Sequence, residues 1–124
     1  MSEINTGRGS RPRRVAAAPD GMLWVTYYGN GKLAKIDPTA MKVVKEYQLP
    51  HGDEGPYAVN TDGAGIVWAN EINTESVVRF DPKTEQMRVI KLPGRNTGIR
   101  KMAVDAQGRL WYMGSHNGRL GMIE

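Results

Sequence analysis

The 124-residue sequence contains no cysteine, only one phenylalanine and no long apolar run. Without cysteine the chain has no disulfides, no thiolate metal ligands and no cysteine nucleophile, which excludes small disulfide-bonded scaffolds. No apolar segment approaches the roughly 20 residues that a membrane-spanning helix needs. Residues 1–14 carry arginines without an apolar stretch behind them, so we expect no secretory signal and a cytoplasmic location.

The chain does contain many turn-forming residues and a moderate positive charge. Fifteen glycines and seven prolines favour a turn-rich protein over a helical bundle. Seventeen basic and thirteen acidic residues give a net charge of +4, and Arg8, Arg11, Arg13 and Arg14 make the N-terminal segment basic. Such a cluster can contact phosphates, but no aromatic residues interleave with these arginines as a base-stacking platform, so we expect no nucleic-acid binding.

Three tryptophans recur at one spacing, 44 and 43 residues apart, and each follows a turn: Trp24, Trp68 and Trp111. An Asp-Pro dipeptide recurs at the same interval, beginning at Asp37 and Asp81, and a Leu-Pro dipeptide begins at Leu49 and Leu92. Landmarks that keep the same order and nearly the same spacing predict a repeat protein.

Within the middle unit, short apolar segments alternate with turn residues. We expect its strands at 57–60, 66–71, 77–81 and 87–92, because Asp-Gly and Asp-Pro sequences between them favour tight turns. No segment shows a clean helical period, so we expect almost no helix. Four antiparallel strands in about 43 residues are typical of a β-propeller blade, whereas a β-sandwich, the alternative, does not need a fixed period.

The predicted fold is therefore all-β, with propeller blades at approximately 14–50, 56–93 and 101–124 after an N-terminal arm at 1–13. Three blades do not close a ring, since propellers use about four to eight. Two apolar blade faces and one sheet edge would stay uncovered, so we expect a homodimer that forms a six-bladed ring, each chain being a half-propeller. The third unit lacks a fourth strand; the arm near Ile4 of the other subunit can supply it, and a disordered tail is the alternative.

Two strings, GPYAVNTDGAGIVWANEINTESVVRFDP at 55–82 and RKMAVDAQGRLWYMGSHNGRLGMIE at 100–124, resemble the blades of virginiamycin B (streptogramin B) lyases and their relatives. Those proteins repeat a proline–aromatic strand opening, a turn, a tryptophan strand and a third strand that ends near Asp-Pro. The resemblance covers residues 11–124 and implies a propeller. The lyases are seven-bladed single chains, so this sequence resembles only their C-terminal three-blade portion.

The resemblance also implies a magnesium-dependent elimination that opens a cyclic depsipeptide at its ester linkage. In the lyases, a histidine just after the proline of a first strand acts as the base, with a glutamate two residues before it. After Pro56 this sequence has Tyr57, with Gly55 at the glutamate position, and we align Arg14-Val15 and Lys101-Met102 with Pro56-Tyr57 in the other units. Only Tyr57 carries over, because a tyrosine after the proline also occurs in the lyases' substrate site.

Antiparallel connectivity puts two kinds of loop on one face of the ring: the links from a fourth strand to the next first strand, and the turns from a second strand to a third. Propeller ligands bind over the central channel where such loops converge. On this face we expect the following ligand-binding residues: Tyr27, Tyr28, His51, Arg100 and Lys101. Their cations favour an anionic small molecule.

The catalytic candidates are His116, Tyr57 and Glu71. His116 lies in a Gly-Ser-His-Asn-Gly turn, where a neutral imidazole can act as a general base, and a solvated surface histidine is the alternative. Glu71 is also the candidate ligand for Mg²⁺, the one cofactor we consider, together with Asp53 and Glu54 of the preceding loop. Ordinary surface acids are the alternative to a metal site.

Three functions of different kinds follow from these features. The first is a lyase-like half-propeller that binds a ligand on the channel face of a dimeric ring. The second is a magnesium-dependent lyase or hydrolase that opens a small cyclic ester or lactone with His116, Glu71 and Tyr57. The third is a self-associating fragment of a longer propeller that has no selected activity.

Overall fold

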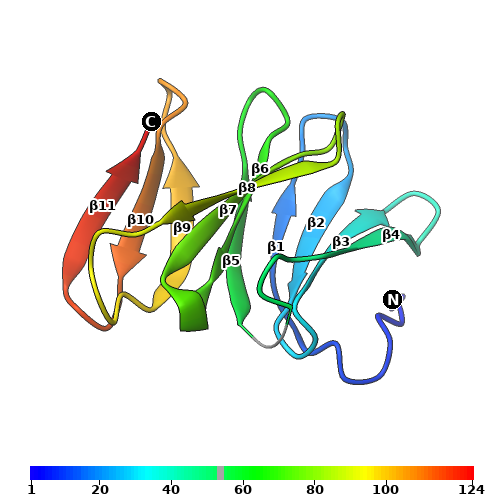
Figure 1. Ribbon diagram of the computed structural model, residues 1–124. Helices are drawn as coiled ribbons and strands as arrows, with labels where there is room; N and C mark the ends of the chain where they lie inside the picture. The colour runs from blue at the N-terminus through cyan, green and yellow to red at the C-terminus, as the bar shows by residue number, and fades with distance from the viewer. Residues whose placement is uncertain (53–54) are drawn as a thin grey trace.

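The computed structural model describes residues 1–52 and 55–124 as a row of three antiparallel sheets (Figure 1). The first sheet contains β1 (Pro12–Ala17), β2 (Leu23–Tyr27), β3 (Lys32–Asp37) and β4 (Lys42–Gln48). The second contains β5 (Pro56–Thr61), β6 (Val67–Glu71), β7 (Ser76–Asp81) and β8 (Gln86–Lys91). The third contains β9 (Ile99–Val104), β10 (Leu110–Gly114) and β11 (Arg119–Ile123), and one 3-10 turn, η1 (Ile72–Thr74), follows β6.

In every sheet the strands lie side by side in chain order, which is the strand order of a propeller blade. We therefore call the three sheets blade 1, blade 2 and blade 3. The predicted all-β class is confirmed, and the four strands predicted for the middle unit agree with β5 to β8 within one residue at each end. In the described part of the chain, no helix has the length and apolar character needed to cross a bilayer.

Aspartate side chains build the turns between the first and second strands of blades 2 and 3. Asp62 accepts hydrogen bonds from the backbone of Ala64 and Ile66, and its second oxygen accepts one from Trp68 Nε1 at 3.2 Å. Asp105 likewise accepts a hydrogen bond from Trp111 Nε1 at 2.8 Å. In blades 2 and 3 the tryptophan ring is thus held by the aspartate of the turn that precedes it.

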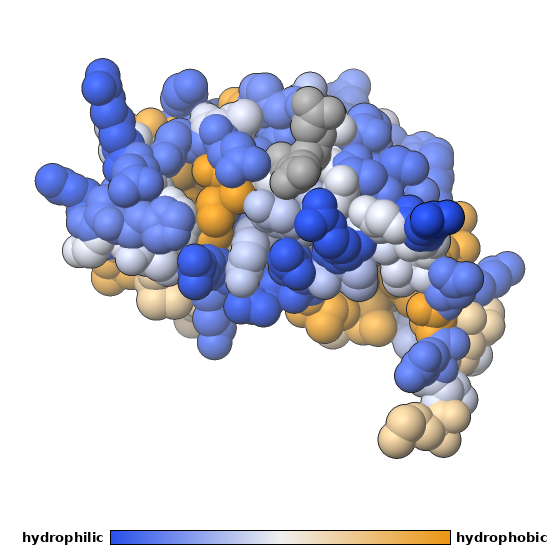
Figure 2. Space-filling view, turned by 90° about the horizontal axis from the view of Figure 1, so that it is seen from below, coloured by the Kyte–Doolittle hydropathy of each residue, from blue (hydrophilic) through white to orange (hydrophobic). Residues whose placement is uncertain are grey.

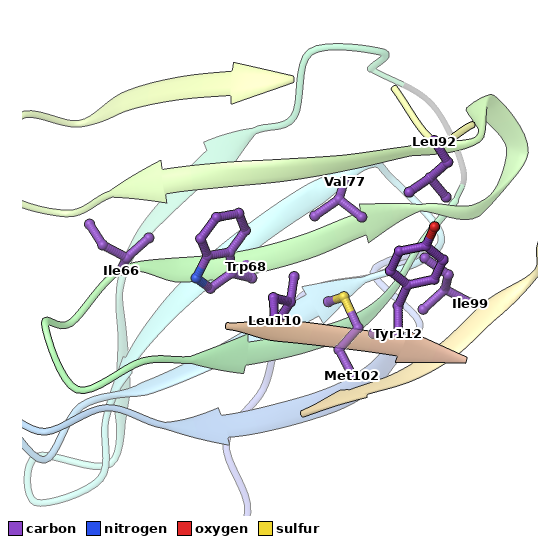
Figure 3. Packing of buried hydrophobic residues seen from close by; sticks show 9 residues of the cluster. Ile66, Trp68, Val77, Leu92, Ile99, Met102, Leu110 and Tyr112 are labelled. Atoms are coloured by element: carbon purple, nitrogen blue, oxygen red, sulfur yellow. The ribbon is translucent and has the colours of Figure 1, made fainter. Parts of the chain in front are cut away.

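Apolar layers join neighbouring blades. Figure 3 shows the layer between blades 2 and 3, in which blade 2 and the link after it contribute Ile66, Trp68, Val77 and Leu92 and blade 3 contributes Ile99, Met102, Leu110 and Tyr112. The layer between blades 1 and 2 has the same construction, with Trp24, Leu33 and Leu49 from the blade 1 side and Val67, Val78 and Phe80 from blade 2. In both layers the tryptophan of one blade packs against the next blade.

A polar contact accompanies each apolar layer. Thr26 Oγ1 donates a hydrogen bond to the carbonyl of Tyr57 at 2.7 Å, and Asn70 Nδ2 donates one to the carbonyl of Ile99 at 2.9 Å. Thr26 and Asn70 are both fourth residues of their strands, β2 and β6. Each bond joins the second strand of one blade to the first strand of the next. It therefore fixes the position of the two blades relative to each other along their strands.

The N-terminal arm lies against its own blade 1. Ile4 packs on a buried cluster formed by Tyr27, Ala34 and Ile36. Closer to β1, the carbonyl of Ser10 accepts a hydrogen bond from the backbone of Gly29 at 2.9 Å. The arm and blade 3 lie at opposite ends of the row (Figure 1), so within one chain the arm does not reach β11. Strand donation to another subunit stays a prediction.

Candidate functional site

The long connections gather at one end of the molecule, the lower end in Figure 1. This end carries the β4–β5 and β8–β9 links and the turns that follow β2, β6 and β10, as the antiparallel connectivity predicts. Figure 2 views it from below and shows hydrophilic side chains over most of the surface. We call this end the loop face.

A hollow of about 450 Å³ opens among the residues of the loop face, and all three blades contribute to it. We call it the channel-face hollow. Its walls are Arg13 and Tyr28 from blade 1, Tyr57, Ile72, Asn73 and Glu75 from blade 2, and Asn96, Gly98, Arg100 and His116 from blade 3 and the link before it. The predicted residues Tyr28, Tyr57, Arg100 and His116 are therefore brought together.

Arginine and tyrosine side chains stack inside the hollow. The guanidinium carbon of Arg13 lies 4.6 Å from the centroid of the Tyr28 ring, and that of Arg100 lies 5.9 Å from the centroid of Tyr57. The two tyrosine rings meet edge to face, with their centroids 6.3 Å apart. The two arginine–tyrosine contacts are cation–π interactions, which hold a guanidinium group in place while leaving its N–H donors available.

The strand register makes three residues of the three blades equivalent: Arg13, Tyr57 and Arg100. Each of them follows the residue that pairs with the last position of the second strand, namely Pro12, Pro56 and Ile99. The first strands therefore present one side chain each to the same part of the hollow.

The sequence alignment of Arg14-Val15 and Lys101-Met102 with Pro56-Tyr57 is consequently wrong by two residues. Blade 3 opens with Ile99 where blades 1 and 2 open with a proline, so the proline landmark is absent there. The register shift near the opening is the same in all three first strands and leaves the spacing unchanged, so the interval between the tryptophans leads from Pro56 to Pro12 and Ile99.

No carboxylate among residues 1–52 and 55–124 forms an ion pair with Arg13 or Arg100. The one glutamate on the described wall, Glu75, is engaged elsewhere, because its oxygens accept hydrogen bonds from the Thr97 backbone at 3.0 and 3.1 Å. The hollow therefore presents two guanidinium groups that form no ion pair with a carboxylate of the described residues.

Glu75 has a left-handed backbone, with φ 54°. It directly precedes the third strand, a position that is glycine in the other two blades, at Gly31 and Gly118. A non-glycine residue in this conformation costs about 1–3 kcal/mol, so the side chain offsets strain by bonding Thr97 at the wall. Sequence reasoning missed Glu75, although the comparison of the three turns would have revealed it.

His116 is exposed at the hollow, and its ring lies over Gly98, where a β-carbon would clash with it. Its backbone N–H donates to the carbonyl of Thr97 at 3.2 Å. Its ring nitrogens make no hydrogen bond to any described residue. The imidazole is thus held by packing over Gly98 and not by hydrogen bonds from its ring to the described residues.

Glu71 is buried outside the walls of the hollow, with 4% of its surface exposed. Both of its oxygens are used by His51, one by the backbone N–H at 3.0 Å and the other by Nδ1 at 2.8 Å. Two of the predicted site residues thus pair with each other instead of meeting His116. Sequence reasoning missed this pair because the loop that carries His51 folds back onto β6.

Glu71, the predicted magnesium ligand, belongs to no cluster of metal-binding side chains in the described part of the chain. Within 1–52 and 55–124, no three His, Cys, Asp or Glu side chains lie close enough together to hold a metal ion. Glu71, the predicted ligand, already accepts hydrogen bonds at both oxygens. The other acids of that prediction, Asp53 and Glu54, lie outside the described residues.

Two further predicted residues lie elsewhere. Tyr27 is fully buried beside Ala34 and Ile36, where burial, together with the charge of Glu46, raises the pKa of the phenol to about 12. Lys101 borders a second hollow of about 440 Å³ between β1, β5 and β9, which Arg100 also lines. Tyr27 thus belongs to the core, whereas Lys101 lies at the first strands and does not line the channel-face hollow.

The sequence profile of the virginiamycin B lyase family matches residues 2–124. The chain belongs to the virginiamycin B lyase family. Among curated protein sequences, none matches it. The family explains why the tryptophan, the Asp-Gly turn and the Asp-Pro dipeptide recur together, because each belongs to the propeller blade.

Solved structures share this fold. Selenomethionine-substituted virginiamycin B lyase from Staphylococcus aureus superposes with a TM-score of 0.89 at 19% identity, covering 100% of this chain and 41% of that chain. A catalytically inactive histidine-to-alanine variant of that lyase with quinupristin gives 0.81 at 21%, covering 97% and 43%. Hydrazine synthase from Kuenenia stuttgartiensis gives 0.81 at 17%, covering 97% and 34%. The chain spans about two fifths of the length of these lyases, and the likeness is one of fold.

Within the virginiamycin B lyase family, this chain departs from the histidine pattern at the first strands. The residues after the strand openings are Arg13, Tyr57 and Arg100, and none carries an imidazole. The histidine of the hollow, His116, comes instead from the turn between β10 and β11. The three equivalent positions supply cations and an aromatic ring in place of a base.

Proposed function

We propose that this virginiamycin B lyase-family chain binds a small anionic molecule in the channel-face hollow. The observation that carries the proposal is the pair Arg13 and Arg100, which line one hollow without a carboxylate partner among the described residues. Guanidinium groups bind carboxylates and phosphates through paired, charge-assisted hydrogen bonds. The rings of Tyr28 and Tyr57 hold the arginines and offer an apolar surface to the rest of the ligand.

The electrostatics favour the same class of ligand. The chain has a net charge of +4, and Arg14 lies beside the hollow with its guanidinium carbon 5.1 Å from the Tyr57 ring. Several cations around one concave surface attract an anion and raise its local concentration. Binding of this kind weakens as the ionic strength increases. We further propose that the protein acts in the cytoplasm, as the sequence predicts.

The alternative is a lyase or hydrolase that opens a small cyclic ester or lactone with magnesium. What favours it is the presence of His116 and Tyr57 in one hollow, since an exposed imidazole can remove a proton from a substrate held there. Against it stands the pairing of Glu71, because both of its carboxylate oxygens form hydrogen bonds with His51. Within the described residues, the predicted trio is not assembled.

Titration of the ¹⁵N-labelled protein with inorganic phosphate and with benzoate tests the binding proposal. Both probes should shift the side-chain Nε–H resonances of Arg13 and Arg100, and Arg100→Gln should weaken binding about tenfold, since a hydrogen bond to a charged group contributes roughly 1.5–3 kcal/mol. Arg88→Gln, on exposed β8, is the matched control and should leave the affinity unchanged. Equal affinity in both variants, or no shift at either arginine, would contradict the proposal.

Incubation with a streptogramin B antibiotic and Mg²⁺, followed for ring opening, separates the two functions. The binding proposal predicts no turnover by the natural chain. Turnover that is lost in His116→Ala and kept in the Arg88→Gln control would establish the lyase instead. The phosphate titration of the same His116→Ala protein shows whether the hollow is still formed.

A further inference from the structure

Blade 3 has an apolar face that points away from blade 2, which we call its outer face, and no described residue covers it. Leu33, Val77 and Leu120 are equivalent, because each pairs with the fourth residue of its second strand. Leu33 and Val77 are fully buried against the next blade, whereas Leu120 is 66% exposed. Met113 and Met122 lie beside Leu120 and are also exposed. Blade 3 therefore carries a surface suited to contact a following blade.

The outer edge of β11 is also unpaired among the described residues. In blades 1 and 2 the third strand pairs with a fourth, but among the described residues no strand pairs with the outer edge of β11. A hollow of about 740 Å³ lies along this edge, between residues 120–122 and the link at 93–97. Free strand edges with open N–H and C=O groups accept an added strand readily.

The opposite end of the row supplies a strand of the right kind. Tyr47 of β4 packs on Phe80 of blade 2, with ring centroids 4.6 Å apart. Ile4 of the N-terminal arm packs on the cluster that contains Ile36, the residue of blade 1 equivalent to Phe80. Relative to blade 1, the arm thus lies where β4 lies relative to blade 2, which is the place of a preceding blade's fourth strand.

We propose that a second copy of this chain covers blade 3. The outer face of blade 3 packs against blade 1 of the second copy, and residues 2–6 of that copy's arm pair with β11 as its fourth strand. The same contact made twice about a two-fold axis gives six blades, and it leaves neither a free strand edge nor an uncovered apolar face. This interface does not depend on the ligand proposed above.

Light scattering on the purified chain tests the assembly. The natural chain should have twice the mass of one polypeptide, and Leu120→Arg should be monomeric because it places a charge in the blade–blade layer. Val89→Arg is the matched control, since Val89 is an exposed apolar residue of β8 outside the interface, and it should stay dimeric. A monomeric natural chain, a species of three or more chains, or a dimeric Leu120→Arg protein would overturn the proposal.

Cysteine cross-linking tests the strand pairing and does not depend on a variant that weakens the dimer. Tyr47 pairs with Leu33 of its own blade and packs on Phe80 of the next one. Ile4 holds the corresponding place against the Ile36 cluster of blade 1, so Ile4 should lie opposite Leu120 of the other copy.

Because the natural chain has no cysteine, single variants can be mixed. Ile4→Cys mixed with Leu120→Cys should form a disulfide-linked heterodimer under mild oxidation, and Glu3→Cys, one residue earlier in the arm, probes the adjacent register. Ile4→Cys mixed with Val89→Cys is the control and should not cross-link. If neither arm variant forms a covalent pair with Leu120→Cys above the level of this control, the arm does not pair with β11 and the proposal fails.

Discussion

Blade 2 and blade 3 have nearly the same local construction but different surroundings. All five residues of β6 are buried, whereas β10 alternates between buried and more exposed positions. In both blades an aspartate of the preceding turn accepts a hydrogen bond from the tryptophan Nε1, at 3.2 Å from Trp68 and 2.8 Å from Trp111. Trp68 is then covered by blade 3, while Trp111 stays partly exposed.

This comparison shows that strand sequence and turn chemistry build a blade, but the next blade buries it. The side-chain amide of Asn70 donates a hydrogen bond to the first strand of blade 3. The equivalent residue of blade 3 is Met113, which is exposed and has no side-chain donor of this kind. The two blades should therefore respond differently to the same kind of substitution.

The largest difference is expected at the tryptophans. Trp68→Ala should lower the free energy of unfolding by about 3–5 kcal/mol, because it empties a large volume between two blades. Trp111→Ala, made in the monomeric Leu120→Arg background, should lower it by a clearly smaller amount. Urea unfolding measured relative to each parent checks this, and equal losses would show that Trp111 is already covered within a single chain.

A smaller difference is expected at the fourth residues of β6 and β10. Asn70 bonds the carbonyl of Ile99 at 2.9 Å and the N–H of Ala58 at 2.7 Å, so Asn70→Ala leaves buried backbone groups unpaired and should cost about 1–3 kcal/mol. In the same Leu120→Arg background, Met113→Ala should change stability by less than about 0.5 kcal/mol, as is usual for exposed positions. Denaturant midpoints report both, and a large loss at Met113 would show that this residue is already covered within a single chain.

The smallest effect concerns the acid stability of the blade 3 turn. Hydrogen bonds from Trp111 and then from Arg109 hold the pKa of Asp105 well below its usual range. A carboxyl whose pKa is lowered on folding stabilises the fold above its unfolded pKa of about 3.9, and this contribution is lost as the pH falls. Asp105→Asn should thus flatten the fall of the melting temperature below about pH 4, whereas Asp20→Asn, in the corresponding exposed turn of blade 1, is the control. An unchanged slope in Asp105→Asn would contradict this account.

Much of the fold could be predicted because the residues that define a blade lie close together in the sequence. The turn aspartate, the tryptophan and the Asp-Pro dipeptide are close in sequence, so their spacing fixed the strands of the middle unit within one residue. The loop face followed from antiparallel connectivity, which placed Tyr28, Tyr57, Arg100 and His116 at one hollow.

The rest depends on contacts that local pattern does not encode. Arg13 is the exception, because Pro12 and Pro56 are separated by the same interval as Trp24 and Trp68, so the spacing alone would have found it. The bond between His51 and Glu71 joins a loop to a strand end twenty residues further along the chain, and it removes Glu71 from the predicted catalytic group. Tyr27 was expected at the ligand but is buried with Ile36, because its side chain points into blade 1's outer cluster.

Amide hydrogen exchange along β11 tests most directly whether another copy of the chain provides the cover that blade 3 lacks. In the natural chain, the outer-edge amides of β11 should be protected nearly as well as those of β7, and in Leu120→Arg that protection should be lost while β7 keeps its own. Rapid exchange along β11 in the natural chain, or equal protection in both proteins, would contradict the account.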